Sequence, residues 1–121
     1  MRSQRYRLLF YATAARREPV ADWLDRLRVE QRAKVLWVLE RLADSGFALG
    51  PPWLRKLDEE IWEVRITSGK SAFRVLFAQV ASSELLLLEA FAKKTEKTPS
   101  RYLDTARKRL LSHWQRSGQG R

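Results

Sequence analysis

Residues 61–77 alternate between apolar and polar side chains in two stretches, which predicts a β-hairpin. The stretches meet at Gly69-Lys70, and glycine in the first position suits a two-residue type II′ turn. Glu63, Arg65 and Arg74 should then lie together on one face of the sheet. The apolar side chains of both strands are expected on the opposite face: Trp62, Val64, Ile66, Phe73, Val75 and Phe77.

The same register places Arg65 directly opposite Arg74 on the neighbouring strand. Like charges at opposed positions destabilise a sheet. A sheet that tolerates this pair either solvates both guanidinium groups or uses them to bind an anion. We interpret the two arginines as the floor of a phosphate site, provided that no β-bulge turns them apart.

The remaining pattern alternates between further strands and helices. Strands are predicted at residues 5–12, 53–57 and 84–92, the last being apolar enough for burial on both faces. Helices are predicted from Pro19 to about Leu27, over 30–44 and over 100–115. The apolar stripe of the second helix is expected to comprise Ala33, Val35, Leu36, Leu39, Leu42 and Ala43. The corresponding stripe of the third comprises Tyr102, Leu103, Ala106, Leu110 and Trp114.

This order of elements predicts an α+β fold. An antiparallel sheet would pack against an N-terminal two-helix hairpin, with a C-terminal helix completing the domain. The length of 121 residues suits one domain, which we place at residues 1–116. Residues 117–121 are expected to form a flexible tail.

Composition narrows the possible chemistry. The chain has no cysteine and one histidine, His113, which excludes a disulfide framework and leaves little for a metal centre or a Ser-His triad. We therefore expect no metal and no cofactor. No run of 18 apolar residues and no apolar signal core occur, so we expect a soluble, cytoplasmic protein without a membrane partner.

The net charge of +10 and the sequence pI of about 10.7 favour a polyanionic partner such as RNA, DNA or an acidic protein. Basic side chains from separate elements would converge beside the hairpin and contact a nucleic-acid backbone. They are Arg55, Lys56, Lys93, Lys94 and Lys97, with Tyr102 beside them. RNA carries its own nucleophile, the 2′-hydroxyl, so a nuclease there needs only a base, an acid and charge stabilisation.

Each of these residues also has a structural alternative. Glu63 is either a general base or the ion-pair partner of a neighbouring arginine. Lys93 and Lys94 either bind phosphate or protect the end of a buried strand from aggregation. Tyr102 either contacts RNA or packs at the rim of the core, and Trp53 either stacks with a base or belongs to the core.

Three segments resemble the phage-derived, HigB-like branch of the RelE/ParE toxin superfamily, and the resemblance spans about residues 5–112. They are Trp62-Glu63-Val64-Arg65 with the preceding Leu57, Phe73-Arg74-Val75-Leu76-Phe77, and Leu86 to Pro99 with its Phe91-Ala92-Lys93-Lys94-Thr95 core. The resemblance implies a RelE-like fold and a toxin of a type II toxin–antitoxin pair. It also implies an antitoxin with a helix-turn-helix DNA-binding domain as partner.

The resemblance further implies roles for particular residues. Arg74 resembles the sheet arginine at the scissile phosphate, and Arg65 and Lys93 occupy basic positions nearby. Lys94 shares the basic segment of Lys93, and Tyr102 resembles a late tyrosine of such toxins. Two positions depart from the pattern: Glu63 stands where RelE proper is more basic, and Glu89 stands where a histidine is common.

Three functions follow as alternatives. The first is a metal-independent mRNA endoribonuclease, in some relatives ribosome-dependent, with Arg74, Arg65, Glu63 and Lys93 as catalytic residues. The second is a ParE-like inhibitor of DNA gyrase without nuclease activity. The third is a relative that binds RNA and leaves it intact.

Overall fold

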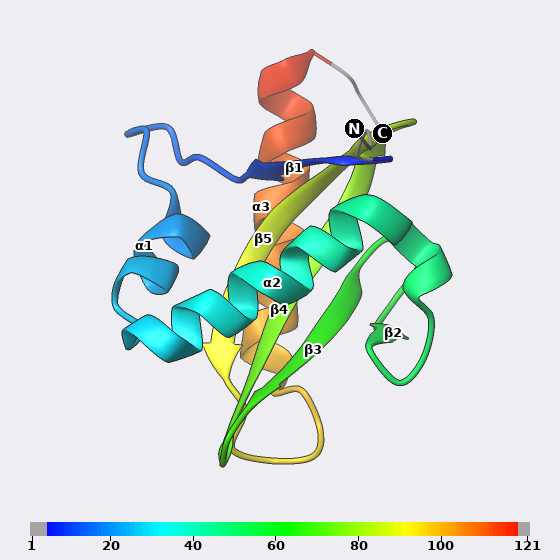
Figure 1. The fold of residues 1–121 in the computed structure, drawn as a ribbon. Coiled ribbons are helices and arrows are strands. Elements are labelled where there is room, and N and C mark those ends of the chain that lie inside the picture. Colours follow the sequence, from blue (N-terminus) through cyan, green and yellow to red (C-terminus); the bar gives the residue numbers. More distant parts are fainter. Residues whose placement is uncertain (1–4, 119–121) are drawn as a thin grey trace.

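The computed structural model describes residues 5–118, and these contain a five-stranded sheet, three α-helices and one 3-10 helix (Figure 1). The elements are β1 (Arg7–Phe10), α1 (Pro19–Asp25), α2 (Val29–Ser45), η1 (Gly46–Leu49), β2 (Leu54–Lys56), β3 (Trp62–Ser68), β4 (Ser71–Ala81), β5 (Glu84–Ala92) and α3 (Ser100–Ser117). The α+β class is therefore as predicted. Helix α3 extends one residue into the expected tail, and residues 119–121 lie outside the described range.

The sheet has the strand order β1-β5-β4-β3-β2. Strands β2 to β5 pair antiparallel, but β1 pairs parallel to β5, with Leu9 opposite Leu86. The prediction of a purely antiparallel sheet was wrong at this edge. Two parallel strands require a long connection, and here the chain from α1 to β4 connects β1 to β5.

The register of the hairpin agrees with the alternation in the sequence. Arg65 pairs with Arg74, and Ser68 pairs with Ser71 across the turn. Gly69 has a φ of +59°, as the first central position of a type II′ turn requires. The irregularities of register lie between β4 and β5, after Leu76 and after Gln79, and therefore leave the opposed arginines in place.

Helices cover both faces of the sheet. Helices α1 and α2 lie over one face, where α2 crosses the strands, while α3 lies behind the other (Figure 1). Helix α1 packs on β5 and α2 packs on β3, so the structure does not confirm the predicted antiparallel helical hairpin. Helix α3 buries Ala106, Leu110 and Trp114 against the second face, which confirms its predicted stripe.

The buried stripe of α2 differs in part from the prediction. Val35, Leu39, Leu42 and Ala43 are buried as expected, and Val38 joins them. Ala33 and Leu36 are exposed, so their assignment to the core was wrong. Positions 35, 38, 39 and 42 follow the i, i+3, i+4, i+7 spacing of one helix face, whereas Leu36 lies a residue away around the helix.

Polar contacts fix α3 to the sheet and to the turn before β3. Arg107 Nε donates to Asp58 Oδ2 at 2.8 Å, and the backbone amides of Glu60 and Ile61 donate to Asp58 Oδ1. Arg109 Nη1 lies 2.7 Å from the carbonyl oxygen of Leu88 and 3.3 Å from the carboxylate of Glu89. Glu89 on β5 therefore forms an ion pair with α3.

Asp58→Ala should lower the free energy of unfolding by about 1–2 kcal/mol, because it removes charged hydrogen bonds to α3 and to the turn before β3. Burial raises the pKa of Asp58, but the hydrogen bonds from Arg107 and the two amides outweigh it and leave the pKa lowered. The ionised carboxylate of Asp58 therefore adds to the free energy of unfolding at neutral pH, and this contribution is lost as the pH falls through the folded-state pKa. Urea unfolding over this pH range measures it. The exposed Glu59→Ala is the control, and equal losses in both variants would contradict the role of Asp58.

Candidate functional site

Arg74 lies on β4 with 5% of its surface exposed, between Arg65 on one side and Phe91 on the other. Its Nη1 donates to the carbonyl oxygen of Phe73 at 2.9 Å, and its Nε lies 3.7 Å from Glu63 Oε1. Burial lowers the pKa of Arg74, the Glu63 carboxylate acts in the opposite direction, and Arg65 lowers it further. Because arginine stays protonated in proteins, a positive charge is held here with limited access to water.

Glu63 is the carboxylate that compensates this charge. It is 1% exposed and accepts a short hydrogen bond from the Thr98 hydroxyl group as well as facing Arg74. One carboxylate therefore joins β3, β4 and the loop of residues 93–99. This arrangement matches the structural alternative for Glu63, the ion-pair partner of an arginine.

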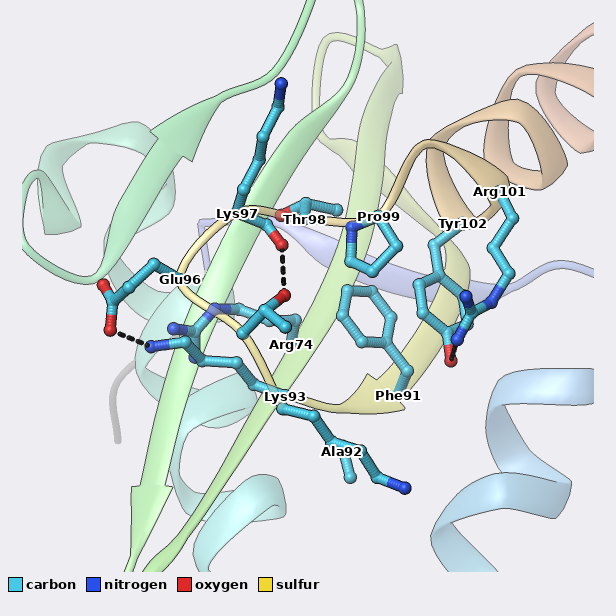
Figure 2. A pocket seen from close by; sticks show the side chains of 12 residues that line it. Arg74, Phe91, Ala92, Lys93, Glu96, Lys97, Thr98, Pro99, Arg101 and Tyr102 are labelled. Atoms are coloured by element: carbon cyan, nitrogen blue, oxygen red, sulfur yellow. Dashed lines mark hydrogen bonds and ion pairs between the residues drawn. The ribbon is translucent and has the colours of Figure 1, made fainter.

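A pocket of about 190 Å³ lies over Arg74, enclosed by the loop that joins β5 to α3 (Figure 2). Glu96 is the one carboxylate among the described residues that line the pocket. Its hydrogen bond from Lys93 Nζ, at 3.2 Å, lowers the pKa of Glu96. The cationic side chains of the lining outnumber it: Arg74, Lys93, Lys94, Lys97 and Arg101. The pocket is therefore suited to an anion.

One wall of the pocket is aromatic. The rings of Phe91 and Tyr102 are stacked with centroids 3.8 Å apart and an interplanar angle of 1° (Figure 2). The guanidinium carbon of Arg101 lies 4.6 Å from the Tyr102 centroid, and Arg101 Nη2 donates to the Tyr102 hydroxyl at 3.1 Å. Tyr102 thus has a packing role while it also lines the pocket.

The structure brings together only part of the predicted set. Arg74, Lys93, Lys94, Lys97 and Tyr102 all line the pocket. The others lie around it. Glu63 is buried beneath Arg74, and Arg65 lines a neighbouring groove together with Arg74. Arg55 and Lys56 line another groove, which shares Lys97 and Thr98 with the pocket. Lys56 Nζ lies 5.9 Å from the Trp62 ring centroid.

Seven residues that line the pocket were absent from the predicted set: Phe91, Ala92, Thr95, Glu96, Thr98, Pro99 and Arg101. Arg101 had a detectable signal, because it is a cationic residue in the first turn of α3, next to Tyr102 and shortly after the lysines of the 93–99 loop. Thr98 had none, since its bond to Glu63 joins positions 35 residues apart in the chain.

The fold and the pocket define a class of small, basic α+β proteins with an anion site on the sheet. Residues 22–111 match the family described as phage derived protein Gp49-like (DUF891). The match covers more than half of the chain and includes every residue of the pocket, so the protein belongs to this family. The family is associated with RelE-like toxins of toxin–antitoxin systems, which implies a cognate antitoxin as partner.

A search of curated proteins gives no match to this chain. Among the described residues, no helix combines the length and the apolar character that crossing a membrane requires.

Proposed function

We propose that this protein is a HigB-like toxin that cleaves mRNA without a metal ion. The observation that carries the proposal is the buried Arg74 guanidinium at the base of a pocket with five cationic side chains and one carboxylate. Such a site fits a phosphodiester and the additional negative charge that develops when it is attacked. Among the described residues, no group of three or more His, Asp or Glu side chains is placed to hold a metal ion.

The proposed reaction uses the 2′-hydroxyl of RNA as nucleophile. The 2′-oxygen attacks the adjacent phosphorus while its proton passes to a base, and the 5′-oxygen of the next nucleotide leaves with a proton from an acid. The products are a 2′,3′-cyclic phosphate and a 5′-hydroxyl end. Arg74 and Lys93 stabilise the charge on the non-bridging oxygens, and Arg65 raises the positive potential beside them.

Within this proposal Glu63 is a positioning residue. Its carboxylate is buried beneath Arg74 and is occupied by Arg74 and Thr98, so the nucleophilic hydroxyl has no direct path to it. The carboxylate that lines the pocket is Glu96, which is ionised at neutral pH; the Lys93 ammonium group lowers its pKa and so weakens it as a base. Lys94, Lys97 and Tyr102 contact the RNA on either side of the scissile phosphate.

Induction of the protein in cells, followed by primer extension on mRNA, tests the proposal directly. We expect growth arrest with new 5′ ends in coding regions, and cleavage that persists in EDTA when purified components are used. A parallel gyrase supercoiling assay should show no inhibition. Gyrase inhibition with intact mRNA would replace this proposal by the ParE-like function, and RNA binding without cleavage would replace it by a binding function.

A further inference from the structure

A second groove, of about 330 Å³, adjoins the pocket. The two meet at Arg74 and Lys93, which line both. The groove runs past Arg65 and Thr67 on β3 to α2 and to the segment before β2. An extended ligand bound over Arg74 can therefore enter this groove.

Two tryptophans line the far part of the groove with much of their surface in water. Trp37 on α2 is 53% exposed, and Trp53, just before β2, is 48% exposed. Lys34 Nζ and the guanidinium carbon of Arg41 each lie 5.2 Å from the Trp37 ring centroid. Large aromatic side chains rimmed by polar groups are a recurrent feature of interaction sites.

The charged side chains that line this groove are all cationic. Lys34, Arg65, Arg74 and Lys93 line it, and no carboxylate is among its described lining residues. A groove elsewhere on the protein, beside Leu111, is instead lined by Asp58, Glu59 and Glu60. Of these two grooves, the one that adjoins the pocket combines exposed apolar surface with cationic side chains and no carboxylate.

We propose that this groove binds the single-stranded nucleotides that flank the scissile phosphate, with bases stacked on Trp53 and Trp37 and phosphates beside Lys34 and Arg65. Cationic and aromatic side chains that alternate along a groove are the general means of binding single-stranded nucleic acid without sequence preference. An acidic protein segment would pair with the cations alone. Single-stranded RNA would contact the cations with its phosphates and the tryptophan rings with its bases. The inference rests on the proposed function, since it extends the same RNA beyond the pocket.

The test uses oligonucleotides of 2′-O-methyl RNA, which lack the nucleophile and stay intact. One of about twelve nucleotides is long enough for pocket and groove, and one of about three reaches the pocket alone. Fluorescence anisotropy at fixed salt gives Kd for the parent and for Trp37→Ala and Trp53→Ala. Leu36→Ala is the matched control, because Leu36 is a comparably exposed neighbour on α2 that does not line the groove.

Each tryptophan variant should bind the longer oligonucleotide about tenfold more weakly, as expected for the loss of one stacked base. Binding of the shorter oligonucleotide and of a long abasic one should be unchanged, and phenylalanine at either position should restore most of the affinity. Because both side chains are half exposed, the variants should retain the parental Tm.

Unchanged affinity in both tryptophan variants, or an equal loss in Leu36→Ala, would overturn the proposal that this groove binds the flanking nucleotides. The proposed function would remain intact. Variants that bind RNA normally but lose an acidic protein partner would also overturn it, with that partner as the occupant. A parent protein that binds neither oligonucleotide and cleaves no RNA would overturn both proposals.

Discussion

Arg74→Ala should reduce RNA cleavage by at least about 100-fold and abolish growth arrest. In the proposed mechanism the guanidinium stabilises the charge that develops in the transition state, and loss of one such donor costs about 100- to 1000-fold in other enzymes. Arg74→Lys keeps the charge but loses the planar fork of donors, so we expect an intermediate rate. Single-turnover cleavage of a defined RNA measures both.

Folding has to be separated from catalysis in this test, because Arg74 is buried against Glu63. Arg74→Ala leaves the Glu63 carboxylate without its ion pair, and the double variant with Glu63→Gln removes that unpaired charge. Arg17→Ala on the exposed connection after β1 controls for the loss of one positive charge. A folded Arg74→Ala protein that cleaves RNA at the parental rate would remove Arg74 from the mechanism.

Glu63→Ala should lower the free energy of unfolding by about 3 kcal/mol or more, since it leaves a buried arginine without its counterion. This is a large share of the total stability of an ordinary domain. Thr98→Val removes the hydrogen bond alone and should cost about 1 kcal/mol. Glu63→Gln still accepts a hydrogen bond from Thr98 and should fall between the two, as measured by urea unfolding.

The same variants separate the two roles weighed for Glu63. A positioning residue predicts that Glu63→Gln lowers the cleavage rate but keeps the shape of the pH–rate profile. A general base predicts that the acidic limb of the profile disappears. Parental stability in Glu63→Ala, together with a lost acidic limb, would show that Glu63 acts on the substrate and does not serve to hold Arg74.

The difference between the two roles depends on burial, which the local sequence does not show. Alternation places Glu63 and Arg74 on one face of the sheet, but an open face would have left both in water. Helix α3 covers part of that face, and the loop before it carries Thr98 onto Glu63. The carboxylate that had been considered as a base is thereby placed below the pocket.

The pairing of Arg65 with Arg74 could be predicted from the sequence because a hairpin is a local structure. Its register depends on the turn at Gly69-Lys70 and on a period of two, both contained in residues 61–77. The buried stripe of α3 was accessible for the same reason, since helical spacing alone defines it. The lysines of the 93–99 loop were identified through their charge and their place after a buried strand.

Contacts between distant segments were decided by the tertiary structure. Strand β1 pairs with β5 in parallel because β5 offers it a free edge after the whole chain has folded, and no local pattern encodes that choice. Trp53 had stacking as one of two alternatives, but Trp37 belonged to no predicted site until α2 was placed beside the groove. The sequence by itself determined the side chains that share a face, because neighbouring backbone geometry controls them. Only the packing of α2, α3 and the 93–99 loop decided which of those side chains meet water, each other or a ligand.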